Sequence, residues 1–243
     1  MRYKNIVSAI FIERPNRFIA ICDINGQTVK AHVRNTGRCR ELLIKGVKVY
    51  LEVSDQEKRK TGYTLIAVEK GDRLVNIDSL APNKVVLENL QNGKLVFPDL
   101  GKPKHIKTEK QFSDSKFDIY LETGDNKAFV EVKGVTLEED GIALFPDAPT
   151  ERGIKHMKEL IKAVNEGYYA YIIFIVQMKG VSSFSPNVRT HPEFGVELNN
   201  AYKSGVHILC FDTVIEADSI TLADPVPVVI APYENRSGKG LKH

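Results

Sequence analysis

Two carboxylates and a lysine lie within a predicted β-hairpin near the middle of this 243-residue chain. Asp118 lies in the run 116–121, and Glu131 and Lys133 lie in the run 129–133. Apolar residues alternate with others in both runs, as is typical of half-buried strands. Because side chains two residues apart share a face of a strand, Glu131 and Lys133 point the same way. The spacing therefore predicts that all three charged groups converge on one patch of the sheet.

The first strand of this hairpin is expected to have one apolar face and one mixed face. We expect Phe117, Ile119 and Leu121 on the first face. Asp118 and Tyr120 then lie on the second. Carboxylates inside such a pattern need partners, and a divalent cation shared by the two acids would be one. A solvated sheet face with a cross-strand ion pair is the alternative, and the hairpin alone leaves both interpretations open.

The order of these residues resembles a large nuclease superfamily whose motif is Asp, a spacer, and then Glu-x-Lys. Here it reads Asp118, twelve intervening residues, and Glu131-Val132-Lys133. The resemblance implies that both acids and the carbonyl of Val132 bind Mg²⁺ (or Mn²⁺), and that Lys133 positions or activates the attacking water. Such an ion neutralises the anionic phosphodiester and lowers the pKa of a bound water. Glu109, nine residues before Asp118, either extends this acidic cluster or is an ordinary surface glutamate.

A second resemblance covers nearly the whole chain. Three runs resemble, in order and spacing, signatures of the sugar fermentation stimulation protein A family: Asn35-Thr36-Gly37-Arg38, Phe145-Pro146-Asp147-Ala148 and Phe184-Ser185-Pro186. The resemblance implies an α+β protein of two domains. These are an amino-terminal OB-like β-barrel and a carboxy-terminal mixed α/β sheet of the restriction-endonuclease-like type. It also implies that DNA is the partner.

The charge of the chain is unevenly distributed. Residues 1–80 hold 15 Lys and Arg against 9 Asp and Glu, a net of +6, whereas the whole chain has a net charge of +3. A basic front part and an acidic back part suit a polyanion-binding module joined to a metal-binding module. Ordinary fluctuation in composition is the simpler alternative.

The candidate nucleic-acid-binding residues lie in one turn of the front part. They are Arg34, Asn35, Thr36, Gly37, Arg38 and Arg40. Such a basic turn suits phosphate groups. For Asn35 and Thr36, simple capping and turn formation is an equal alternative. The basic loop Lys58–Lys60 carries less weight, because charged loops are usually solvated.

Residues 1–80 are predicted to be an all-β domain. Five strands are expected, at about 6–12, 18–22, 28–33, 46–53 and 63–68. A short helix at Arg38–Leu43 would separate the third strand from the fourth. This is the arrangement of the OB-fold, whose open face commonly binds oligonucleotides.

Residues 81–104 are predicted to connect this domain to a second one, at 105–243. After the hairpin, the second domain is expected to contain a helix from about Thr150 to Gly167, a central strand at 170–176, a helix at 193–203 and a strand at 206–211. A polar tail ends the chain, from Asn235 to His243. These elements suit the mixed sheet of a nuclease fold.

Polar side chains also cluster where the first of these helices begins. Arg152 and His156 lie four residues apart and therefore share a helix face. If this face borders the metal site, the arginine could hold a phosphate and the histidine could move protons. Asp147 and Glu151 are further catalytic candidates, and their alternative role is to stabilise the helix amino terminus.

Composition limits the remaining choices. The three cysteines are scattered and lack Cys-x-x-Cys spacing, so a reducing cytoplasm is expected rather than disulfides or a zinc site. No apolar run is long enough to span a membrane. We therefore predict a cytoplasmic, DNA-binding protein with a Mg²⁺-dependent phosphodiesterase core, with a homodimer left open. The alternatives are a non-catalytic DNA-binding regulator of sugar metabolism and a hydrolase of a small phosphorylated metabolite.

Overall fold

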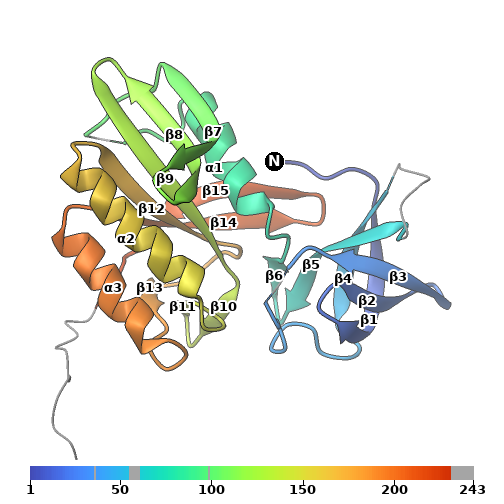
Figure 1. The fold of residues 1–243 in the computed structure, drawn as a ribbon. Coiled ribbons are helices and arrows are strands. Elements are labelled where there is room, and N and C mark those ends of the chain that lie inside the picture. The colour runs from blue at the N-terminus through green and yellow to red at the C-terminus, as the bar shows by residue number, and fades with distance from the viewer. Residues whose placement is uncertain (36, 55–60, 98, 231–243) are drawn as a thin grey trace, which may run out of the picture.

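The computed structural model describes residues 1–35, 37–54, 61–97 and 99–230, which form two domains side by side (Figure 1). The first domain is a closed five-stranded barrel of β1 (Ile6–Asn16), β2 (Ile19–Ile24), β3 (Gln27–Val33), β4 (Lys48–Val53) and β5 (Tyr63–Lys70). The barrel closes where β3 pairs with β5 in parallel, and β6 (Arg73–Asn76) extends the sheet beyond β5. Apolar residues that alternate along these strands point into the barrel, as the buried residues Val29, Ala31 and Val33 of β3 illustrate.

The predicted helix at Arg38–Leu43 is wrong. The chain there forms a hydrogen-bonded turn, in which the N–H of Leu43 donates to the carbonyl of Cys39 at 2.9 Å. Cys39 has a left-handed backbone with φ of 47°, which interrupts a right-handed helix. Its side chain and that of Leu42 are buried in the core. The segment therefore folds so that it buries two apolar side chains instead of continuing as a helix.

The second domain is built on a six-stranded mixed sheet in the order β15-β14-β12-β9-β8-β7. Its strands are β7 (His105–Phe112), β8 (Ser115–Thr123), β9 (Asn126–Val135), β12 (Tyr169–Val176), β14 (His207–Glu216) and β15 (Ser219–Pro225). A three-stranded sheet is formed by β10 (Leu137–Glu139), β11 (Ile142–Phe145) and β13 (Ser183–Pro186). The barrel and this mixed sheet confirm the predicted α+β fold class.

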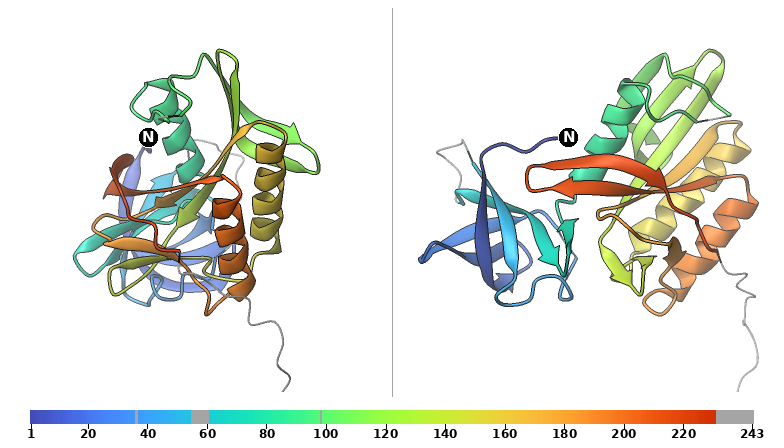
Figure 2. Two further views of the ribbon diagram at one scale, coloured as in Figure 1. Left: turned by 90° about the vertical axis from the view of Figure 1, so that its left-hand side faces the viewer. Right: turned by 180° about the vertical axis from the view of Figure 1, so that it is seen from behind.

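Helices cover both faces of the large sheet (Figure 2). α2 (Glu151–Asn165) and α3 (Pro192–Lys203) lie on one face, and α1 (Ala81–Gln91) lies on the other. β12 is buried between them, so its apolar residues alternate in direction: Phe174 packs with α2 and α3, and Ile173 packs with α1. The central strand predicted from a near-continuous apolar run is therefore confirmed. Its residues are apolar on both sides because helices cover both faces of the sheet.

The segment 81–104, expected to connect the domains, also contributes to the second core. Val86 and Leu90 of α1 are fully buried against the sheet. Phe97, further along the segment, stacks on Tyr171 with ring centroids 4.1 Å apart. These contacts attach the segment to the second domain along much of its length.

A buried polar network joins the two domains, and we call it the domain junction. Gln177, directly after β12, donates from Nε2 to Oδ1 of Asn76 at 2.8 Å and to the carbonyl of Asp78 at 3.1 Å. Tyr3 accepts from Nδ2 of Asn76 and donates to the carboxylate of Asp78. Arg34 pairs with the same carboxylate. Buried polar groups of both domains are thus satisfied by each other, which favours one arrangement of the domains.

The end of the described chain forms a hairpin that the sequence did not predict. β14 continues from the expected strand to Glu216 and returns as β15. The polar tail from Asn235 to His243 and the basic loop Lys58–Lys60 lie outside the described residues. No helix in the described ranges is long and apolar enough to cross a membrane.

Candidate metal centre

Strands β8 and β9 separate where the predicted carboxylates lie. Their ladder runs from Thr123 and Asn126 to the pair Ile119 and Val130, and it ends there. Beyond that pair, the N–H of Val132 donates to Oδ2 of Asp118 at 2.8 Å instead of to a backbone carbonyl of β8. The carboxylate of Asp118 therefore lies between the two separated strands.

This separation corrects the predicted faces of the first strand. Ile119 and Leu121 pack on the α1 side of the sheet, as one face. Phe117 packs in the other cluster, together with Tyr120, and its ring centroid lies 5.3 Å from that of Phe129. The prediction that Phe117 shares a face with Ile119 is wrong: β8 parts from β9 beyond Ile119, and the alternation of its side chains shifts there.

Glu131 is buried and only half satisfied by hydrogen bonds. Its side chain is 3% exposed. Oε1 accepts a hydrogen bond from Nζ of Lys133 at 2.5 Å and contacts Nδ1 of His156. Oε2 is buried and has no hydrogen-bond partner among the described residues. An ionised oxygen in this position is expected to attract a cation, because burial without a partner is costly.

Asp118 accepts two hydrogen bonds, but its surroundings disfavour its negative charge. Oδ1 accepts from Nδ2 of Asn83 on α1 at 2.7 Å, and Oδ2 accepts from the N–H of Val132. Burial and the negative charge of Glu131 raise the pKa of Asp118 above its usual range. Burial alone would raise the pKa of Glu131 too, but the hydrogen bond from His156 and the charge of Lys133 hold it below its usual range. The pair would gain from one more positive charge between the carboxylates.

His156 links the site to α2. Thr150 caps the start of this helix, since its Oγ1 accepts from the N–H of Gly153 at 3.0 Å, and the helix buries His156 on the side that faces the sheet. Nε of Arg152 donates to Nε2 of His156 at 3.4 Å. Because Nε2 accepts this bond, Nδ1 carries a proton, which faces Glu131.

The potential ligand atoms of the site are of the kind that bind a hard divalent cation. Two carboxylates and backbone carbonyls are oxygen ligands of the kind that Mg²⁺ and Ca²⁺ prefer. The orphaned oxygen of Glu131 and the repulsion between Glu131 and Asp118 would both be relieved by such an ion. Within the described ranges, no group of three or more His, Cys, Asp or Glu side chains is placed to hold a metal ion. Backbone and water oxygens would therefore have to complete the coordination.

Comparison with known proteins agrees with both domains. A model described as the SfsA N-terminal OB domain matches residues 12–77, and one described as the sugar fermentation stimulation protein RE domain matches residues 80–219. A sugar fermentation stimulation protein homolog from Desulfitobacterium hafniense is 56% identical over 94% of this chain and 98% of the relative. The chain belongs to the sugar fermentation stimulation protein family.

Other members of the family match along the same length. A homolog from Ruminiclostridium cellulolyticum is 54% identical over 94% of this chain and 99% of its own. The solved structure of Pyrococcus furiosus SfsA in complex with Ca²⁺ aligns with a TM-score of 0.86 at 31% identity, covering 95% of this chain and 98% of that one. The likeness to the archaeal protein therefore spans both domains.

In this family member, the predicted metal ligands and several predicted catalytic residues lie together. Asp118, Glu131 and Val132 meet at the separated strands, and Lys133 and His156 both contact Oε1 of Glu131. Arg152 joins them through His156. The spacing of the hairpin thus placed the acidic pair and the lysine at one point.

Two predicted residues of this family member lie away from the pair. Glu109 is not part of the acidic cluster, because its exposed carboxylate pairs with Lys116 at 2.6 Å. Glu151 is the first residue of α2, has an 89% exposed side chain and lies 3.7 Å from Nε2 of His191. It fits the alternative role of a negative charge at a helix amino terminus.

Asp147 lies at an interdomain pocket instead of at the acidic pair. This pocket, of about 160 Å³, is lined by residues of both domains, among them Asn35, Gly37, Gly134 and Asp147. Asn35 shapes the turn, since its Oδ1 accepts from the N–H of Gly37 at 2.8 Å and its Nδ2 donates to the carbonyl of Ile77. A Cβ on Gly37 would collide with the Asp147 carboxylate, so only glycine allows this close approach.

The predicted nucleic-acid-binding arginines divide into two groups. Arg34 is committed to ion pairs, with Glu52 at 3.0 Å and with Asp78 at 3.3 Å. Arg38 and Arg40 are exposed on the barrel. Thr36 lies outside the described residues. Arg34 therefore belongs to the domain junction, which leaves Arg38 and Arg40 as the accessible cations of this turn.

Asn83 is a site residue that sequence reasoning missed. It follows Pro82 near the start of α1, in the segment that the sequence predicts as a connector between the domains. Its contact with Asp118 joins residues 35 positions apart, from a helix on one side of the sheet to a strand within it. No local pattern in the sequence could have indicated this contact.

Proposed function

We propose that this protein is a divalent-metal-dependent nuclease that hydrolyses phosphodiester bonds in DNA. The observation that carries the proposal is the state of Glu131. One of its oxygens is engaged by Lys133 and His156, and the other is buried without a hydrogen-bond partner among the described residues, while the charge of Glu131 raises the pKa of Asp118. A buried carboxylate oxygen without a partner is costly, and a cation beside it would relieve this cost.

One relative supports a divalent cation as a ligand of this protein. The Pyrococcus furiosus protein, 31% identical along nearly its whole length, was solved in complex with Ca²⁺. We propose Mg²⁺ (or Mn²⁺) as the working ion here, held by Asp118, Glu131 and the carbonyl of Val132. When bound, such an ion neutralises the phosphodiester and makes a coordinated water a better nucleophile.

The residues around the pair have separate roles in the proposed reaction. Lys133, whose Nζ lies 2.5 Å from Oε1 of Glu131, orients the attacking water at the carboxylate. His156 fixes the rotamer of Glu131 through its Nδ1 proton. Arg152 has an exposed guanidinium at the edge of this group and can hold a phosphate oxygen. The DNA strand itself is held by the basic front domain.

One observation favours a second function, a DNA-binding protein without catalysis. The described residues contain no metal-ligating cluster of three or more side chains, and the Glu131–Lys133–His156 contacts could be structural on their own. In that case the acidic pair stabilises the sheet, and the protein regulates sugar metabolism by binding DNA. The free, buried cysteines fit a cytoplasmic location for either function.

A cleavage assay separates the two functions. Wild type is incubated with labelled DNA and either Mg²⁺, Mn²⁺ or EDTA, beside Lys133→Met and, as a matched surface control, Lys158→Met of the exposed side of α2. The nuclease proposal expects cleavage that needs metal, is lost in Lys133→Met and is kept in the control. DNA binding without cleavage under every metal would overturn the catalytic proposal in favour of the regulator.

A further inference from the structure

The barrel carries a basic groove of about 570 Å³, which we call the barrel groove. Its lining contains five cationic side chains and one acidic one: Arg14, Arg17, Arg38, Arg40, Lys45 and Glu13. The groove lies between the end of β1 and the turn that follows β3. Its charge is that of a surface for a polyanion.

Arg14 has a structural role in the groove, and the other four cations are available to bind phosphates. Both of its terminal nitrogens donate to backbone carbonyls, including those of Asn35 at 2.6 Å and Gly37 at 2.8 Å, so it ties the turn to β1. The remaining four cations are exposed. None of these four forms an ion pair with a carboxylate in the described part of the chain. They are therefore available for phosphates.

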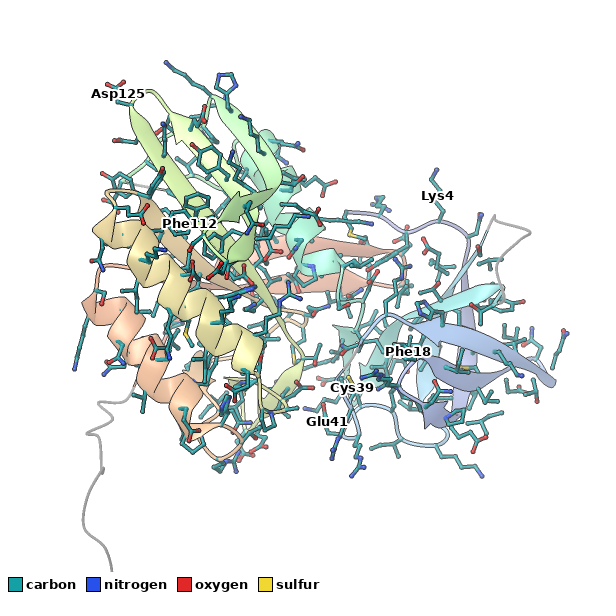
Figure 3. All side chains as sticks on the ribbon, in the orientation of Figure 1. Lys4, Phe18, Cys39, Glu41, Phe112 and Asp125 are labelled. Atoms are coloured by element: carbon teal, nitrogen blue, oxygen red, sulfur yellow. The ribbon has the colours of Figure 1, made fainter. Side chains whose placement is uncertain are left out.

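An exposed aromatic ring stands at the edge of the groove. Phe18, in the turn between β1 and β2, is 47% exposed and is labelled on the barrel in Figure 3. The guanidinium of Arg17, which lines the groove, lies 4.8 Å from its ring centroid. A large exposed ring beside a cationic groove is the combination that stacks an unpaired base while its phosphates are neutralised.

The barrel groove leads toward the metal centre. Gly37 lines both the barrel groove and the interdomain pocket, so the two hollows meet at this residue. Gly134, which directly follows Lys133, lines the interdomain pocket from the other domain. A strand that crosses Gly37 would thus reach the chain segment that carries Lys133.

We propose that the barrel groove binds an unpaired DNA strand, with one base stacked on Phe18 and its phosphates on Arg17, Arg38, Arg40 and Lys45. This inference rests on the proposed DNA-binding function and names its substrate class: single-stranded DNA, or duplex with an unpaired end. The bases inside a duplex already stack on each other, so they present no free face to Phe18. A continuous duplex would use the cations but not the ring.

The decisive measurement is binding in EDTA, which excludes cleavage. Fluorescence anisotropy of the full chain is recorded with a labelled oligodeoxynucleotide and with the duplex of the same sequence. Phe18→Ala should weaken binding of the single strand by roughly fivefold or more and leave duplex binding unchanged. Phe18→Tyr should restore wild-type affinity. Tyr202→Ala, which removes a 62% exposed aromatic ring on α3, is the matched control and should have no effect.

Salt dependence tests the cations separately. Arg38→Gln combined with Arg40→Gln should reduce the salt slope of single-strand binding by roughly 0.7 per lost phosphate contact. Lys203→Gln, an exposed cation at the end of α3, should leave the slope unchanged.

The outcomes distinguish this inference from the proposed nuclease. Tighter binding of duplex than of single strand, or equal affinity of Phe18→Ala and wild type for the strand, overturns the inference even if the protein cleaves DNA. The expected binding pattern without cleavage under any metal upholds the groove and overturns the catalytic proposal. Absence of any DNA binding overturns both.

Discussion

Arg34 and Asp78 form an ion pair between Nη1 and Oδ2 at 3.3 Å, and the side chain of Asp78 is fully buried. The arginine also pairs with Glu52 at 3.0 Å and is itself 17% exposed. Arg34 stands next to the turn that resembles the family signature, yet its guanidinium points into the domain junction. The same short segment therefore supplies a structural arginine and, four residues later, the exposed Arg38.

This division predicts opposite effects of two similar substitutions. Arg34→Ala should destabilise the protein by about 3 kcal/mol, because it leaves the charge of Asp78 buried without its cation. Arg38→Ala should leave stability within about 0.5 kcal/mol of wild type, because the side chain is exposed, and should weaken DNA binding. Urea unfolding of both variants measures the difference. Equal stability of the two variants would contradict the assignment of Arg34 to the junction.

The two carboxylates of the candidate metal centre, Asp118 and Glu131, should also respond differently to neutralisation. Asp118→Asn removes a charge that burial and Glu131 disfavour but also loses one of the two hydrogen bonds that Asp118 accepts, so the metal-free variant should melt close to the wild-type temperature. Glu131→Gln leaves Lys133 without its carboxylate, so that variant should melt earlier. Thermal melting in EDTA is the measurement. Early melting of both variants would indicate that the acidic pair is a structural feature only.

Divalent ions should stabilise the wild type through the same pair. A ligand that binds only the native state raises the free energy of unfolding by about 2.7 kcal/mol at a hundredfold excess over its Kd. Mg²⁺, Mn²⁺ and Ca²⁺ should therefore raise the melting temperature of the wild type, and Asp118→Asn should lose this response. A wild type indifferent to all three ions would contradict the metal centre.

Asn83 should tune the affinity of the centre without being a ligand. It donates to Oδ1 of Asp118, and loss of such an outer partner commonly costs tenfold or more in metal affinity. Asn83→Ala is therefore expected to weaken Mn²⁺ binding by roughly tenfold, measured by calorimetric titration. Lys84→Ala, at the next and exposed position of α1, is the control. Unchanged affinity in Asn83→Ala would mean that Asp118 is oriented by Val132 alone.

One interdomain ion pair gives a pH-dependent contribution to stability. Nζ of Lys70 lies 2.7 Å from Oε2 of Glu138, and its hydrogen bond holds the pKa of Glu138 below its usual range. A carboxyl with a lowered pKa stabilises the folded state above its unfolded pKa of about 4.3, and this stabilisation is lost as the pH falls through the folded pKa. Glu138→Gln should thus cost about 1 kcal/mol at neutral pH and progressively less below about pH 4.

The neighbouring residue provides the control for this pH dependence. Glu139 pairs with Arg189, but both side chains are about half exposed or more, at 47% and 69%. Exposed pairs contribute little, so Glu139→Gln should behave like wild type at both pH values. Urea unfolding of the two variants at neutral and acidic pH is the measurement. A cost of Glu138→Gln that does not change with pH would contradict the role of its charge.

The parts of the site that could be predicted from the sequence are those with a local pattern. Alternation in the hairpin placed Glu131 and Lys133 on one face, and the helical spacing placed Arg152 beside His156. The contact of Asn83 with Asp118 and the burial of Arg34 at the junction depend on how distant elements pack. The spacing of residues along the sequence does not indicate such contacts.

The errors in the predicted fold have the same physical origin. Strict alternation puts Phe117 on the wrong face because it assumes unbroken pairing, and the ladder of β8 with β9 ends at Ile119. The sequence predicts a short helix at Arg38–Leu43, whereas Cys39 takes a left-handed backbone and its side chain is buried. In both places the tertiary structure overrides the local preference.

The domain junction has a consequence for the unfolding of the protein. Tyr3 lies at its centre, and the N–H of Tyr3 also donates to the carbonyl of Asp218 in the second domain at 2.7 Å. Neither domain can unfold without stripping buried polar partners from the other, which links their free energies of unfolding. Heating should accordingly produce a single calorimetric endotherm whose measured enthalpy equals the van't Hoff enthalpy, although the chain carries two family domains. We expect the barrel and the sheet to unfold as one cooperative unit.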